Sequence, residues 1–82
     1  MPTVAIIDGI RIEMRPKGKE HNPPHIHAVY GDFDATFDIK TGMILDELFP
    51  FKQAKIVCLF IIENSNDLLE MWNTQSFHKI RR

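Results

Sequence analysis

Two turn dipeptides, Asp8-Gly9 and Gly31-Asp32, most constrain how this chain can fold. Glycine and aspartate tolerate the positive φ angles that a two-residue hairpin loop requires. Strand-like segments flank both dipeptides: TVAII and IRIEMR around the first, HIHAVY and FDATFDI around the second. The chain has only 82 residues. Two hairpins in a chain this short predict an antiparallel sheet within a single domain that spans residues 1–82.

The loop at Asp8-Gly9 sets the register of the first hairpin, because the residues that bound a two-residue loop must face each other. The expected pairs on the core face are Ile7–Ile10, Ala5–Ile12 and Thr3–Met14. Side chains alternate between the two faces of a strand. The opposite face should therefore carry Val4, Ile6, Arg11, Glu13 and Arg15.

The second hairpin follows the same rule. Its expected core pairs are Tyr30–Phe33, Ala28–Ala35 and Ile26–Phe37. Its opposite face should carry His25, His27, Val29, Asp34, Thr36 and Asp38, with His25 across from Asp38 and His27 across from Thr36. This register predicts a polar, solvent-side face on the second hairpin.

The remaining segments predict the other elements of the fold. Residues 15–24, with their prolines, glycine and charges, are typical of a loop, and MILDELF predicts a fifth short strand that ends at Pro50. From residue 51 the apolar residues recur at helical spacing, namely Ala54, Val57, Phe60 and Ile61. DLLEMWNTQS predicts a second helix or a second helical segment, with a buried stripe of Leu68, Leu69 and Trp72. We therefore expect an α+β fold, an antiparallel sheet of four to five strands with C-terminal helix packed on one face.

Composition excludes several classes of protein. Ten basic and eleven acidic residues give a net charge of −1, which argues against a strongly basic nucleic-acid or membrane binder. A single cysteine, Cys58, allows neither an intrachain disulfide nor a thiolate zinc cluster. No apolar run approaches the roughly 18–20 residues of a membrane span, and the N-terminus has no charged region of the signal-peptide kind. We expect a cytoplasmic protein.

Three histidines within seven residues suggest a metal site. His25 and His27 alternate on one strand and share a face, and His21 lies across the bend of Pro23 and Pro24. Asp34 or Asp38 could complete the ligand set or orient an imidazole ring. Three histidines with an open position would suit a divalent transition metal such as zinc, nickel or copper. The sequence gives no identity for such a cofactor.

The same residues could instead perform acid–base catalysis on RNA. Histidine as a residue type titrates near neutral pH, so His25 and His27 could transfer protons, with Asp38 as an orienting group. Three cations nearby could bind a phosphate: Arg15, Lys17 and Lys19. Whether the protein is an enzyme stays open at this point.

A third interpretation is structural. A cross-strand pair of His25 and Asp38 would contribute roughly 0.2–1 kcal/mol, and the residue before each proline of the bend is restricted to extended geometry. The polar face would then be solvated or would bind a partner. This interpretation makes the protein a non-catalytic interaction module.

The stretch EHNPPHIH at residues 20–27, together with the opening MPT, Asp8-Gly9, Tyr30-Gly31-Asp32 and Thr41-Gly42, resembles a family of short bacterial proteins known as domain of unknown function 4160. The likeness covers nearly the whole chain and includes Trp72. The family has no established biochemical activity. Its genes often lie beside a second small family of unknown function, numbered 2442. The resemblance therefore implies a component of a toxin–antitoxin-type operon that acts through a protein partner encoded nearby, and RNA is a further candidate partner.

One departure from the family pattern concerns the predicted helix at 51–63. Relatives tend to carry charges along one face of it, whereas this chain has Cys58, Leu59 and Ile62. A helix that is apolar nearly all round needs a partner on both sides. We expect this helix to form an interface with a partner or with a second copy of the chain, as a homodimer.

Overall fold

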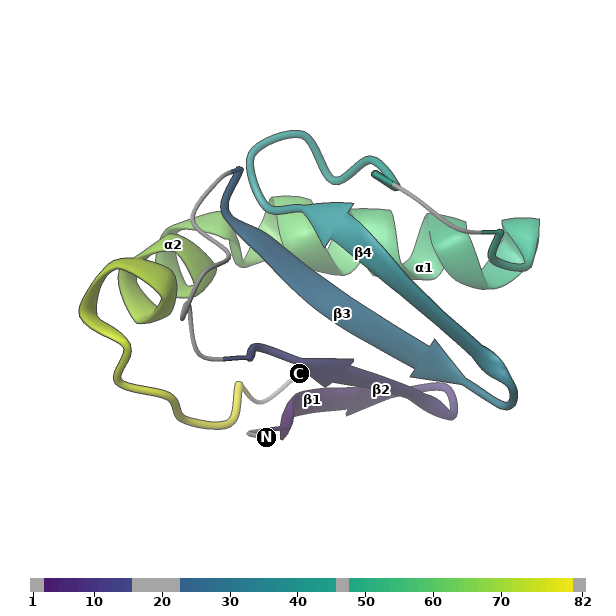
Figure 1. Cartoon of the computed structure of the whole chain (residues 1–82), viewed down its shortest axis with the longest axis horizontal. Helices are drawn as coiled ribbons and strands as arrows, with labels where there is room; N and C mark the ends of the chain where they lie inside the picture. The colour runs from purple at the N-terminus through teal and green to yellow at the C-terminus, as the bar shows by residue number, and fades with distance from the viewer. Residues whose placement is uncertain (1–2, 16–22, 46–47, 81–82) are drawn as a thin grey trace.

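The computed structural model describes residues 3–15, 23–45 and 48–80. It contains four strands, β1 (Thr3–Ile7), β2 (Ile10–Glu13), β3 (His25–Tyr30) and β4 (Phe33–Asp38). Two helices follow, α1 (Phe51–Glu63) and α2 (Ser65–Thr74). The strands form one antiparallel sheet in the order β1-β2-β3-β4 (Figure 1). This arrangement confirms the predicted α+β fold.

The core lies between the helices and one face of the sheet. Buried residues of the strands, such as Ile12, Ile26 and Phe37, form one cluster with Val57 and Phe60 of α1. Three α2 residues complete this cluster: Leu68, Met71 and Trp72. The predicted stripe on α1 is confirmed. In α2, Met71 takes the fully buried place expected of Leu69, which is only partly buried.

The first hairpin follows the expected register near its loop and departs from it farther away. Asp8 and Gly9 both have positive φ, and Ile7 pairs with Ile10 as predicted. The predicted pair of Thr3 and Met14 is wrong, because the register shifts between Thr3 and Ala5 and Thr3 faces Glu13 instead. The irregularity turns the Val4 side chain into the core, where it is fully buried rather than on the opposite face.

The second hairpin has the predicted register along its whole length. Six pairs join the two strands, from Tyr30–Phe33 beside the loop to His25–Asp38 at the far end. Core-face residues Ile26, Ala28, Ala35 and Phe37 are fully buried. The polar residues therefore share the sheet face opposite the core, which is free of helices except at its His25 end, where the Trp72 ring of α2 approaches.

The predicted fifth strand is reduced to a single bridge in the described part of the chain. Ile44 pairs with Phe37, and Leu45 donates its backbone N–H to Thr36. The next two residues, 46 and 47, lie outside the described residues. In the described residues, the segment after β4 thus begins alongside β4 but forms only this one bridge with it.

The C-terminal tail packs against the molecule rather than extending from it. Phe77 and Ile80 contact the core cluster, and the Ile80 backbone N–H donates to the Val4 carbonyl at 2.6 Å. Figure 1 shows the tail running from α2 to the side of β1. Among the described residues, neither helix has the length and apolarity needed to cross a membrane.

Candidate functional site on the helix-free face of the sheet

A row of polar side chains crosses the middle of the helix-free face. Glu13 on β2 faces His27 on β3, which faces Thr36 on β4. Glu13 and His27 are only 7% and 8% exposed, and His25 is 7% exposed. The sequence placed these three residues on the correct face but wrongly expected solvent there. Buried ionisable groups require partners, and the surrounding contacts supply them.

Two arginines enclose the Glu13 carboxylate. Arg11 Nε donates to one oxygen at 2.6 Å, and Arg15 Nη2 donates to the other at 3.2 Å. Burial by itself would raise the pKa of Glu13, but the hydrogen bonds and charges of the two arginines outweigh it and lower this pKa. Glu13 is therefore held as a carboxylate by neighbours on its own strand and just beyond it.

Arg15 also reaches across the sheet to Asp34. Its Nη2 lies 3.0 Å from Asp34 Oδ2. Burial opposes the charged form of Arg15, yet the hydrogen bond and charge of Asp34, followed by those of Glu13, raise the Arg15 pKa. One guanidinium thus bridges two carboxylates. Arg15, one of the three candidate cations for phosphate binding, is therefore already engaged.

His27 lies beside the same aspartate. Its Nδ1 is 3.8 Å from Asp34 Oδ1, close enough for electrostatic attraction when the ring is protonated but too long for a hydrogen bond. The other ring nitrogen, Nε2, has almost no exposed surface. His27 is therefore arranged to support Asp34 rather than to present a basic nitrogen to solvent.

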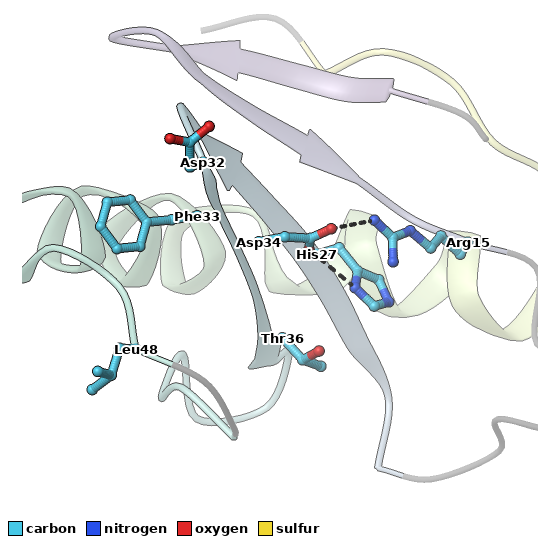
Figure 2. Close-up of a pocket in the computed structure, with 7 residues that line it drawn as sticks. All are labelled: Arg15, His27, Asp32, Phe33, Asp34, Thr36 and Leu48. Carbon is cyan, nitrogen blue, oxygen red and sulfur yellow. Dashed lines mark hydrogen bonds and ion pairs between the residues drawn. The ribbon is translucent and has the colours of Figure 1, made fainter.

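These residues border a hollow of about 580 Å³ at the edge of the sheet, shown in Figure 2. Arg15, His27, Asp34 and Thr36 line one side. The remaining lining residues are Asp32, Phe33 and Leu48, which come from the β3–β4 loop, the start of β4 and the segment before α1. In Figure 2 the Phe33 and Leu48 side chains lie on the opposite side of β4 from the Arg15–Asp34 pair. The hollow therefore combines charged groups with an apolar border.

His25 has a different environment from His27, although the two rings contact each other edge-on at 5.2 Å. The His25 ring also lies 4.8 Å from the Trp72 ring of α2. Its Nδ1 is 2.9 Å from the Pro23 carbonyl oxygen, which can only accept, so Nδ1 carries the proton in the neutral ring. This bond assigns the basic lone pair of His25 to Nε2.

Asp38 faces His25 in the register, as predicted, but its carboxylate serves the following turn. Oδ1 accepts the backbone N–H groups of Lys40 at 2.6 Å and Thr41 at 3.3 Å. Such bonds are typical of an aspartate that stabilises a turn. No contact in the described residues supports the orienting role that the sequence suggested for Asp38.

Several candidate residues fall outside the described ranges. These are Lys17, Lys19 and His21, and His21 belongs to the predicted ligand set of His21, His25 and His27. Among residues 3–15, 23–45 and 48–80, no three His, Cys, Asp or Glu side chains come together as a metal site.

Sequence reasoning missed three residues that line the hollow: Asp32, Phe33 and Leu48. It named Asp34 as a possible fourth metal ligand or as a group that orients an imidazole ring. Asp34 lies two residues before Thr36, the partner of His27, and diagonal neighbours in a sheet are within reach of long side chains. This diagonal relation could have identified Asp34 as a neighbour of His27. No local sequence feature identifies Leu48 as a lining residue.

Fold and site together define a small α+β protein. Its helices cover one face of a four-stranded sheet, and a charged hollow lies at the edge of the opposite face. A family model described as Domain of unknown function (DUF4160) matches residues 9–73. The chain belongs to this family, as its sequence motifs suggested. No curated protein and no solved structure matches the chain.

Proposed function

We propose that this protein is the partner-binding component of a toxin–antitoxin-type pair, and that the hollow beside Asp34 receives a basic side chain of the partner protein. The observation that carries the proposal is the balance of charge around the hollow. Its described lining has two carboxylates, Asp32 and Asp34, and one guanidinium, that of Arg15. Arg15 is shared between Asp34 and Glu13. The surplus is negative, which favours a cationic group over a phosphate.

The shape of the border supports a long side chain. Phe33 is 43% exposed and Leu48 is 85% exposed, so both offer apolar surface beside the carboxylates. Lysine and arginine cover apolar surface with their aliphatic stems while their charged ends stay with polar groups. A lysine or arginine of the partner could lay its stem on Phe33 and Leu48 and direct its charge to Asp32 and Asp34.

Acid–base cleavage of RNA receives less support from the same geometry. A general base must bring a nitrogen within hydrogen-bond reach of the proton that it removes. His27 has a buried Nε2 and its Nδ1 beside Asp34, and His25 is packed on Trp72. Binding is therefore the better account of this face.

The test is a calorimetric titration of the purified chain with the purified product of the neighbouring gene. We expect a complex whose affinity falls about tenfold in Asp34→Asn and about threefold in Asp32→Asn, because each change removes a charge from the hollow. The matched control is Glu70→Gln, an exposed carboxylate on α2 outside this hollow, which should leave the affinity unchanged. The affinity of the wild type should also fall with added salt.

Two results would overturn the proposal. One is the absence of a complex with the wild-type chain. The other is a complex whose affinity is the same in Asp32→Asn and Asp34→Asn as in the control Glu70→Gln. If an RNA oligonucleotide binds instead, and Arg15→Ala abolishes that binding, the hollow serves phosphate and the charge argument is wrong.

Metal binding is a second candidate, and one observation favours it. The hydrogen bond from His25 Nδ1 to the Pro23 carbonyl directs Nε2 to act as the ligand atom, as is common for metal-binding histidines. Elemental analysis of the untagged protein tests this candidate. A metal content near one per chain that His25→Ala removes would support it, and a content below about a tenth would reject it.

A further inference from the structure

The outer face of α1 carries an apolar stripe that nothing in the described chain covers. Phe51, Leu59 and Ile62 are 79%, 60% and 57% exposed. The opposite face of the same helix buries Val57, Phe60 and Ile61 in the core. Large apolar side chains exposed together on one helix face are typical of an interaction site.

The charges on this face are arranged against the helix dipole. Lys52 and Lys55 lie in the first two turns and Glu63 in the last, all three exposed. The first turn has no acidic residue and the last turn has no basic one. Cations near the N-terminus and an anion near the C-terminus of a helix are each unfavourable. Within the chain, Lys55 Nζ lies 5.6 Å from the centroid of the Phe51 ring, a weak cation–π contact that leaves the conflict with the dipole in place.

We propose that two copies of this chain associate through the outer faces of their α1 helices, antiparallel to each other, about a two-fold axis at Leu59. Antiparallel packing brings the end of one helix beside the beginning of the other. Around an axis at Leu59, position 55 of one copy is level with position 63 of its partner. Lys55 then meets Glu63 of the partner subunit, and the symmetry makes this pair twice.

The spacing of the charges along α1 fits this arrangement. Lys55, Leu59 and Glu63 are spaced by four residues and form one ridge along the helix. On a two-fold axis at Leu59 this ridge lies directly across from the same ridge of the second copy, which places Lys55 opposite Glu63 of the partner subunit. Phe51 and Ile62 flank the ridge and contribute apolar area. The dipole conflict is relieved at the same time, because each lysine lies near the C-terminal end of the partner helix and each glutamate near its N-terminal half.

An apolar groove extends this surface toward the sheet. It has a volume of about 260 Å³ and includes Phe51, Ala54, Lys55 and Cys58 of α1. Its other lining residues are Phe37, Gly42, Met43 and Ile44. Met43 is 61% exposed. The groove continues the stripe, so the second copy covers a surface wider than one helix.

This surface is separate from the hollow beside Asp34, so the two proposals fail independently. Analytical ultracentrifugation of the full chain should give twice its 9.6 kDa mass at micromolar concentration. Leu59→Asp should weaken the dimer at least about a hundredfold, because it places two like charges at the axis. Leu59 is exposed, so the variant should keep the circular dichroism spectrum of the wild type. A monomeric wild type overturns the proposal, and so does a dimer that tolerates Leu59→Asp.

A charge swap tests the antiparallel pairing itself. Lys55→Glu and Glu63→Lys should each weaken the dimer about tenfold, whereas the double variant should recover the affinity of the wild type. Failure of the double variant to recover overturns the antiparallel pairing. In a Cys58→Ala background, Leu59→Cys should form a disulfide between two copies on mild oxidation, because a residue on a two-fold axis meets itself. Glu70→Cys in that background is the control and should stay monomeric on denaturing gels, and equal cross-linking at both positions contradicts the axis.

Discussion

The guanidinium of Arg15, just beyond β2, lies 3.0 Å from the carboxylate of Asp34 on β4, so this contact spans the strand between them. The two residues are 19 positions apart in the sequence. The contact joins the edge strand to the middle of the sheet on the face without helices. It also fixes Asp34 at the border of the hollow, where we propose that the partner binds.

Replacing Arg15 should destabilise the fold. Glu13 is 7% exposed, and Arg15→Ala leaves Arg11 as its cationic partner within the described residues. The change also removes the link to Asp34. We expect a loss of about 1–3 kcal/mol in the free energy of unfolding, measured by urea denaturation. The matched control is Arg11→Ala. The Arg11 side chain is 49% exposed, so this change should cost only about 0.5 kcal/mol. Equal losses for the two variants would contradict the bridging role of Arg15.

Stability should fall in acid through Glu13. The Glu13 pKa is below its ordinary value of 4.5 in the folded chain, so the unfolded chain takes up the proton first as the pH falls. The stabilisation is fully present above pH 4.5 and is lost as the pH falls through the folded pKa. Urea denaturation between neutral pH and pH 3 measures this loss in the wild type. Glu13→Gln should be less stable at neutral pH and should show a flatter pH dependence, whereas parallel curves for the two proteins would exclude Glu13 as a source of the acid sensitivity.

Gly42 should resist substitution. Its φ is +76°, and a Cβ atom there would lie 3.0 Å from Cys58 Sγ and 3.2 Å from the Cys58 carbonyl oxygen. Gly42→Ala combines backbone strain with a clash against α1, so we expect a loss of about 2 kcal/mol or more in the free energy of unfolding. Gly31→Ala is the control, with φ +59° but open space at the Cβ position, and should cost about 1 kcal/mol. Thermal denaturation of both variants should show the larger loss of stability for Gly42→Ala, and an equal loss in Gly31→Ala would contradict the clash with Cys58.

The second hairpin could be predicted in full because its loop is short and its strands alternate, so one turn set all six pairs. The register of the first hairpin could not be predicted in full, because the irregularity near Val4 adds a residue to β1 and no local sequence feature indicates it. The burial of Glu13 and His27 could not be predicted from the sequence either. Their surroundings depend on Arg15 contacting Asp34 across the sheet, and such long-range pairing follows from the assembled fold rather than from spacing.

The neutral form of the His25 ring should occupy a single tautomer. The hydrogen bond to the Pro23 carbonyl requires a proton on Nδ1. Long-range ¹H–¹⁵N correlation spectra distinguish the two ring nitrogens, and we expect Nδ1 of His25 to be protonated and Nε2 to show the shift of an unprotonated nitrogen. His78 in the exposed tail provides a reference. A His25 ring protonated on Nε2 alone would rule out this bond and remove the support it gives to metal binding.

The most direct test of the partner-binding account is a chemical-shift titration of the ¹⁵N-labelled chain with the neighbouring gene product. We predict that the largest changes fall on the backbone amides of residues 32–36 and on Arg15 and Leu48, which surround the hollow. The backbone amides of α2 serve as the internal control, and their chemical shifts should change little. Changes confined to α2 and β1, or no changes at a saturating partner concentration, would contradict the proposed site.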